Sequence, residues 1–159
     1  MSFGRILKLG NPLLYERSLP VLPEEIPSLM PVAEELLALI DECRRVHGFG
    51  RGIAAPQIGV MKRLVCLHLD KPYILFNPQL TNMSEGMFEM WDDCMCFPGL
   101  LVNVKRHIAC TLTYTDEHGE ENVWQIENDI SELLQHEVDH LDGILATQRA
   151  VDDKSLRFK

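Results

Sequence analysis

The sequence predicts an α+β fold in which antiparallel strands pack around a central metal-binding helix carrying an HExxH motif, with a second long helix near the amino terminus. Three observations predict this class. An amphipathic helical pattern occupies residues 23–47, short strand-like segments follow between 64 and 126, and the HExxH motif lies at 136–140. Helices segregated from a run of strands are typical of α+β proteins. We expect a single catalytic domain over residues 1–159, because the length suits one core and no internal repeat is present.

The first predicted helix carries apolar residues at helical spacing, namely Leu29, Val32, Leu36, Leu37 and Ile40. Prolines near its start and cations near its end fit the preferences of helix termini. A glycine-rich loop at residues 48–52 follows. This loop resembles a dinucleotide-binding pattern, but Pro56 opposes the helix that such a site requires. We therefore interpret the loop as a turn into a strand, where glycines would let an extended peptide approach the backbone.

Strands are predicted where β-branched and aromatic residues alternate between turn signals. The predicted segments are residues 64–69, 74–76, 79–83, 100–104, 108–114 and 123–126, with a turn at 116–119. The short spacing between them predicts antiparallel pairing.

The last predicted helix contains the sequence His136-Glu137-Val138-Asp139-His140. Two histidines four residues apart lie on one helical face, so they can bind one metal ion with the glutamate beside its open position. We expect Asn128 or Asp129 to cap this helix and Gly143 to end it. The alternative is an ordinary helix with a buried apolar stripe and two histidines by chance of composition.

A third metal ligand must come from upstream of this helix. The position that would hold a third histidine in a metzincin pattern is Ala146, and no glutamate follows Glu137. Cys94 and Cys96 are the best candidates, since a thiolate completes a site of one cysteine and two histidines. The alternative is that both cysteines are small buried apolar residues.

Three motifs in order resemble the peptide deformylases, the metal enzymes that remove the formyl group from the amino terminus of new polypeptides. They are GRGIAAPQ at residues 50–57, DDCMC at 92–96 and QHEVDHLDG at 135–143, and the opening ILKLGNPLL at 6–14 is similar as well. The resemblance covers nearly the whole chain. It implies that Cys94, His136 and His140 bind a divalent ion, Fe²⁺ or Zn²⁺, for which Ni²⁺ or Co²⁺ can substitute.

The resemblance also implies the remaining roles. Glu137 takes a proton from the attacking water, while the Gln57 amide and the backbone N–H of Met95 stabilise the charge on the formyl oxygen. The residues expected to bind the N-formylated peptide are Gly50, Arg51, Gly52 and Asp93.

The chain departs from the family pattern at several positions. Asp92 and Asp93 replace a glutamate and a glycine, Cys96 replaces a serine, and Leu101 replaces an arginine that contacts substrate. Arg106 matches an arginine that can pair with the carboxylate at 92. Charged residues, namely Arg51, Asp129 and Glu132, stand where the family's pocket for the first substrate side chain is often apolar. The alternative is that Asp129 and Glu132 only cap and charge the first turn of the last predicted helix. Two alternatives therefore stay open: a related metalloamidase of altered specificity, and a weakly active or noncatalytic peptide-binding relative.

The composition excludes other classes. The 15 basic and 24 acidic residues give a net charge of −9, which disfavours direct nucleic-acid binding. No apolar run is long enough for a membrane span, so no membrane partner is expected. Five cysteines without a pairing pattern fit reduced thiols, so we expect a cytoplasmic protein or an organelle form, with proximity to the ribosome as a further expectation. The sequence leaves the oligomeric state undetermined.

Overall fold

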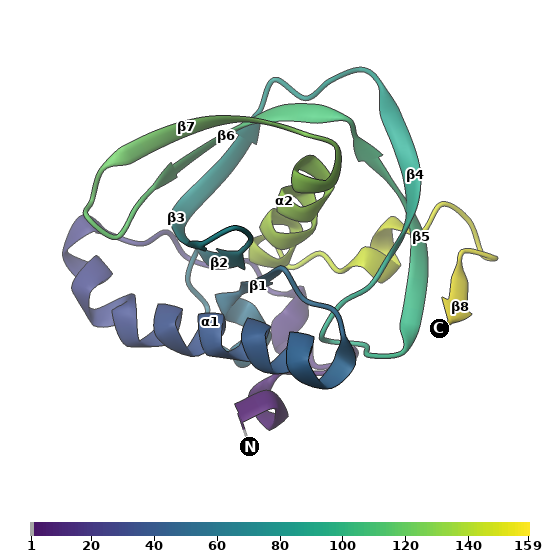
Figure 1. The fold of residues 1–159 in the computed structure, drawn as a ribbon, viewed down its shortest axis with the longest axis horizontal. Coiled ribbons are helices and arrows are strands. Elements are labelled where there is room, and N and C mark those ends of the chain that lie inside the picture. The colour runs from purple at the N-terminus through teal and green to yellow at the C-terminus, as the bar shows by residue number, and fades with distance from the viewer. Residues whose placement is uncertain (1) are drawn as a thin grey trace.

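The computed structural model describes residues 2–159, which form two antiparallel sheets and two α-helices (Figure 1). The five-stranded sheet has the order β1-β2-β3-β6-β7 and the three-stranded sheet has the order β4-β5-β8. The strands of the first sheet are β1 (Gly52–Ala54), β2 (Leu64–His68), β3 (Pro72–Thr81), β6 (Ala109–Thr115) and β7 (Glu121–Glu127). Those of the second are β4 (Met87–Asp92), β5 (Leu100–His107) and β8 (Leu156–Phe158). The expectation of antiparallel strands with two helices is confirmed.

Helix α1 (Ile26–His47) is the long helix predicted near the amino terminus. Figure 1 shows it lying along one side of the molecule, below β1 and β2. Its buried face consists of residues at helical spacing, among them Ala33, Leu36, Ile40 and Cys43. The helix ends at Gly48, whose φ of 74° is the left-handed conformation that glycine adopts without strain. This end delivers the glycine-rich loop to β1.

Helix α2 (Asn128–Leu141) carries the HExxH motif and lies in Figure 1 between the strands of the two sheets. The predicted cap at Asn128 or Asp129 is wrong. The residue before the helix is Glu127, which makes no side-chain capping bond, and Asn128 has a φ of 54°. The Asn128 backbone N–H instead donates to the carbonyl of Ile108, the residue between β5 and β6, at 2.7 Å, so this backbone contact fixes the start of the helix.

The predicted end of α2 at Gly143 is confirmed. Its φ is 74°, and a Cβ placed there would lie 2.5 Å from the Tyr15 carbonyl oxygen. Only glycine therefore fits without a backbone shift.

Two strands of the structure were not predicted, and two segments that were predicted as separate strands form a single strand. Residues 74–76 and 79–83 are joined in β3, with a bulge between Phe76 and Gln79. Asn77 at the bulge has a φ of 50°, and its side chain bonds both the N–H and the carbonyl of Val21. The unpredicted strands are β4 and β8, whereas β1 is the strand that was expected, without bounds, after the glycine-rich loop. Because β1 and β4 are edge strands of different sheets, each leaves one side unpaired for another chain.

Candidate metal centre

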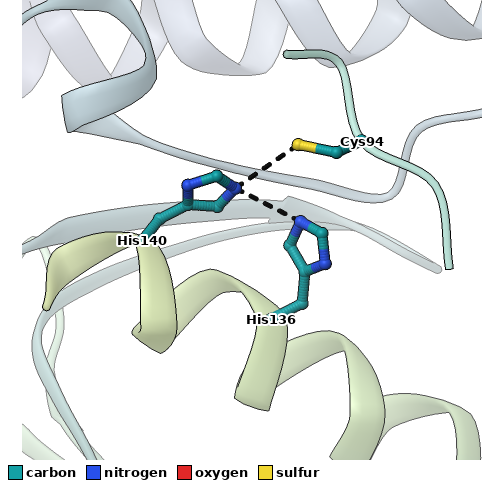
Figure 2. A group of neighbouring side chains, drawn as sticks. All are labelled: Cys94, His136 and His140. Carbon is teal, nitrogen blue, oxygen red and sulfur yellow. Dashed lines mark hydrogen bonds between the residues drawn. The ribbon is translucent and has the colours of Figure 1, made fainter. Parts of the chain in front are cut away.

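Cys94, His136 and His140 converge on one point, as the sequence predicted (Figure 2). Both histidines project from α2, and Cys94 reaches them from the loop after β4. The His140 Nε2 atom lies 3.2 Å from Nε2 of His136 and 3.4 Å from the Cys94 sulfur. All three residues are buried. The cluster is the only such group of metal-ligand side chains found within residues 2–159.

These distances fit a metal ion. With bonds of about 2.0–2.1 Å to nitrogen and about 2.3 Å to sulfur, tetrahedral angles separate two nitrogens by about 3.3 Å and a nitrogen from the sulfur by about 3.5 Å. The observed separations are close to these values. Once the thiol and the facing imidazole nitrogens are deprotonated, their lone pairs repel one another, and a cation between them removes that repulsion. The donor set therefore fits a divalent ion with one open position.

The state of the ligands agrees with this assignment. Burial, followed by the neighbouring His136, holds the pKa of His140 well below its usual range, so its imidazole is neutral. Burial also raises the pKa of the Cys94 thiol. A bound cation reverses the second effect, because a coordinating thiol loses its proton.

Asp92 fixes the orientation of His136. Its Oδ2 atom lies 2.7 Å from the His136 Nδ1 atom, so that nitrogen donates its proton and the opposite nitrogen is free to bind a metal. Burial opposes the positive charge of His136, but the Asp92 carboxylate outweighs burial and raises the pKa of the imidazole to about 9. Without a metal the ring is therefore protonated on both nitrogens at neutral pH, and a bound cation would replace the proton on Nε2. Aspartate is one methylene shorter than the glutamate of the family motif, yet at position 92 it still reaches the His136 imidazole.

Arg106 holds Asp92 in turn, as the resemblance implied. Its guanidinium lies 3.3 Å from Asp92 and 2.9 Å from Asp139, and the arginine is 3% exposed. Asp139 also binds Arg149 at 3.0 Å. Sequence reasoning missed Asp139 and Arg149. The only local signal was the position of Asp139 next to a metal ligand.

Glu137 lies beside the two histidines on the buried face of α2. Burial raises the pKa of its carboxyl to about 7, and its Oε2 atom has no hydrogen-bond partner among the residues that the structure describes. A Cβ on Gly52 would lie 3.2 Å from the Glu137 Cγ atom and 2.9 Å from a Leu67 methyl. Glycine at position 52 therefore allows β1 to approach α2 without a clash with the Glu137 side chain. A carboxyl that titrates near neutrality suits a general base.

The Gln57 side chain is fixed with its amide nitrogen toward the cluster. Its Oε1 atom accepts from the Ala54 N–H at 2.8 Å, while its Nε2 atom donates to the sulfurs of Cys96 at 3.4 Å and Cys94 at 3.7 Å. The residue is 1% exposed. Cys96 therefore contacts the same Gln57 amide as Cys94, but it is not one of the three side chains that converge on the metal site. The loop turns after Cys94, since the Phe97 N–H bonds the Cys94 carbonyl at 3.1 Å.

Met95 lies in the same turn and lines the cavity next to Cys94. Its carbonyl accepts from the Lys8 ammonium at 3.4 Å, which ties the loop to the amino-terminal segment. Its side chain packs beneath Gly50, where a Cβ would lie 3.1 Å from the methionine methyl.

A cavity of ≈ 450 Å³ opens onto the cluster. Its walls are the glycine-rich loop, the end of β4 with the following loop, and α2. Of the predicted site residues, Gly50, Arg51, Gly52, Gln57, Asp93, Cys94, Met95, His136 and Glu137 all line it. Sequence reasoning missed Arg44, whose guanidinium binds the Gly50 carbonyl at 2.9 Å and the His68 carbonyl at 2.7 Å. This arginine fixes the loop against β2.

The rim of the cavity carries charged contacts. Arg51 forms an ion pair with Glu132 on α2. Asp93 pairs with the Lys159 ammonium at 3.1 Å, and that ammonium also lies 3.7 Å from the centre of the Phe49 ring. Leu101, by contrast, pairs with Arg157 of β8 and is not part of the cavity wall.

A helix bearing HExxH, a cysteine from a facing loop and a buried glutamate beside an open cavity define a site of the metallohydrolase class. The sequence profile of the polypeptide deformylase family matches residues 3–155. The chain belongs to the polypeptide deformylase family. A peptide deformylase of Leptospira biflexa is 33% identical over 166 residues, which cover 97% of this chain and 91% of that protein.

Solved structures give the same result. A peptide deformylase from Thermus thermophilus has a TM-score of 0.82 at 34% identity, with 91% of this chain and 84% of that chain covered. The enzyme from Synechococcus elongatus, solved in complex with actinonin, has a TM-score of 0.85 at 26% identity and covers 93% of this chain and 79% of that one. The match to a curated peptide deformylase of Synechococcus sp. spans 57% of that protein's length.

Proposed function

We propose that this chain is a peptide deformylase, which hydrolyses the N-formyl group of the amino-terminal formyl-methionine of new polypeptides and releases formate. The observation that carries the proposal is the convergence of three ligand atoms, an unpartnered glutamate oxygen and a fixed amide donor on one cavity. Family membership supports the same activity. We take residues 1–159 to act as one catalytic domain.

Cys94, His136 and His140 would hold one divalent ion, Fe²⁺ or Zn²⁺, with Ni²⁺ or Co²⁺ as substitutes. Such an ion supplies Lewis acidity, which lowers the pKa of a water and polarises a carbonyl. The thiolate donates more electron density than an imidazole and so moderates that acidity. A formyl group is a small, electrophilic acyl group, for which a moderated centre suffices.

The chain's own residues perform the proton transfers. Glu137 takes a proton from the attacking water and passes it to the departing amine. The Gln57 amide, held by its bond to Ala54, donates to the formyl oxygen as charge develops there, and we assign the backbone N–H of Met95 the same role. Asp92 keeps His136 in the tautomer that leaves its Nε2 atom unprotonated.

The substrate is an extended peptide lying between two sheet edges. The cavity is bordered on one side by residues 50–52, which are the glycine-rich loop and the first residue of β1, and on the other by residues 90–93 at the end of β4. Both strands are sheet edges, so a peptide can pair with either of them. Gly50, Arg51, Gly52 and Asp93 are the proposed contacts. No α-helix within residues 2–159 is both long and apolar enough to cross a membrane. We place the enzyme in the cytoplasm, close to the ribosome, where its substrates emerge.

The test is formate release from N-formyl-Met-Ala-Ser by anaerobically purified protein loaded with Fe²⁺. We expect turnover in the native enzyme and none in Glu137→Ala. A protein that binds the metal and releases no formate contradicts the proposal. A second candidate, a metalloamidase for another acyl group, is favoured by the Arg51–Glu132 ion pair on the cavity wall. Hydrolysis of N-acetylated in preference to N-formylated peptides would identify it.

A further inference from the structure

A trough runs along a face of α2 that does not bear the metal ligands. It consists of two cavities of ≈ 650 Å³ and ≈ 210 Å³, which share Leu80 and Val138 as lining residues. Gln135 and Asp139, one turn apart on α2, also line it, whereas both metal-ligating histidines lie on another face of the helix. Within residues 2–159, none of its lining residues also lines the cavity at the metal centre. We call the space within these two linings the basic trough, and it is separate from the proposed active site.

Positive charge dominates the lining of the basic trough. Among residues 2–159, its cations are Arg17, Arg63, Lys105, Arg106 and Arg149. Its carboxylates in the same range are Asp139 and Asp142, and both already pair with arginines of this set. Because the chain as a whole has a net charge of −9, the excess of positive charge is local. Such a patch attracts a partner of opposite charge and repels others.

One wall of the basic trough is a stretch of strand edge without a neighbouring strand. In the order β2-β3-β6, β2 pairs with β3 only as far as Phe76, whereas β6 pairs with residues 79–81. Residues 79–81 line the larger cavity. Within the described part of the chain, the side of these residues turned away from β6 faces no strand. Backbone N–H and C=O groups at such an edge can pair with an added extended chain.

The lining also offers apolar contacts. Leu80 and Val138 lie where the two cavities meet, and Met83 and Met87, which are 37% and 39% exposed, line the smaller one. Methionine side chains adapt to partners of varied shape. Among the described lining residues there is no phenylalanine, tyrosine or tryptophan. Single-stranded nucleic acids bind by stacking their bases on such rings, so the lining favours a peptide.

We propose that the basic trough binds an extended acidic peptide segment of another protein, which adds as a strand to residues 79–81 of β3. The backbone of the segment pairs with the strand edge, and its apolar side chains contact Leu80 and Val138. Its carboxylates pair with Arg17, whose side chain is 78% exposed and lies 3.8 Å from Asp142, and with the exposed Lys105. The inference is independent of the deformylase activity, because binding is measured without turnover.

The test is the binding of a fluorescein-labelled, acetylated decapeptide of alternating valine and glutamate to the native protein, followed by fluorescence anisotropy. We expect binding that weakens as the salt concentration rises, because salt screens the ion pairs. Arg17→Glu with Lys105→Glu reverses one cation in each cavity and should weaken binding about tenfold or more. Arg45→Glu with Lys71→Glu is the matched control, since it changes the net charge equally at exposed positions outside the trough. It should change the affinity by less than about twofold.

A second peptide separates strand addition from attraction of charge alone. A decapeptide of alternating proline and glutamate keeps the carboxylates and lacks half of the backbone N–H groups, so it should bind about tenfold more weakly or worse. Equal binding of the two peptides overturns the strand addition. An equal loss in the control variant overturns the trough as the site, and so does displacement of the peptide by N-formyl-Met-Ala-Ser, which would place it at the metal centre.

The remaining outcomes concern the occupant. No binding at about 1 mM peptide, or tighter binding of decauridylate at the same salt concentration, overturns the acidic peptide. Self-association of the native protein that Arg17→Glu with Lys105→Glu abolishes would assign the trough to a second copy of the chain and overturn the proposal as well. Thermal unfolding checks that each variant is folded, and Arg17→Glu alone replaces the double variant if that protein is not; it should still weaken binding.

Discussion

Replacing Asp92 by asparagine tests how the metal centre is supported. The carboxylate lies 2.7 Å from the His136 Nδ1 atom and 3.3 Å from the Arg106 guanidinium, and it is 5% exposed. Asparagine keeps nearly the same volume, and its amide oxygen can still accept the imidazole proton. Asparagine carries no charge, however. Of the two carboxylates that pair with Arg106 in the described residues, only Asp139 then remains.

The magnitude follows from these contacts. Removing one partner of a buried ion pair costs about 3–5 kcal/mol of stability. Because Asp139 remains 2.9 Å from the same guanidinium, we expect the lower end, about 3 kcal/mol. Loss of the carboxylate that orients a ligating histidine also lowers metal affinity by about 10–100-fold.

Urea denaturation of the metal-free protein measures the first effect, and competition with a chelator for Zn²⁺ measures the second. The neighbouring variant Asp93→Asn is the control, because Asp93 is 38% exposed and pairs only at the surface with Lys159. It should cost less than about 1 kcal/mol and leave the affinity unchanged. Asp92→Glu restores the charge and should recover most of the loss in both measurements. If Asp92→Asn behaves like Asp93→Asn, the support assigned to Asp92 is wrong.

Four further substitutions test individual residues. Glu137→Ala should retain the metal, measured by elemental analysis, and lose formate release; retained turnover would exclude it as the base. Cys94→Ala should lose both, and a normal metal content would remove it from the ligand set. Gln57→Leu should lower kcat by about 10²–10³ with little change in metal content, since one donor to the developing charge is lost; an unchanged kcat contradicts that role. Gly143→Ala should destabilise the protein by about 1–3 kcal/mol in urea denaturation, because its φ is 74° and the new Cβ meets the Tyr15 carbonyl, whereas a neutral result would mean that this turn relaxes freely.

Periodicity predicted the two helices well, because each is long and buries one face. Its failures are physical. β1 and β8 have three residues each, too few to show alternation. β4 does alternate, but its buried end is Asp92, a charged residue that the apolar pattern of a strand excludes. The start of α2 was misplaced because a backbone bond to Ile108 fixes it, and no side-chain cap is present.

The ligand cluster was predictable because two ligands share one helix turn and the third stood out as a cysteine. The pairing of Arg106 with Asp92 was implied by resemblance and is confirmed. The contacts of Arg51 and Arg44 were not predictable from the sequence. Arg51 meets Glu132 across 81 residues, and a contact between distant segments leaves no local pattern.

The position of Cys94 has a consequence for folding. It follows β4 of the three-stranded sheet, whereas both histidines belong to α2, which also contacts strands of the five-stranded sheet. Cys94 and His140 are 46 residues apart in the sequence. The proposed ion therefore cross-links two parts of the chain. Closing a loop of this length by a covalent link would remove entropy from the unfolded chain worth about 4 kcal/mol. A reversible link acts by mass action, so stability rises with the free metal concentration. Chelation would then loosen the docking of the two sheets as well as stop turnover, and the supply of metal would set how much folded protein persists.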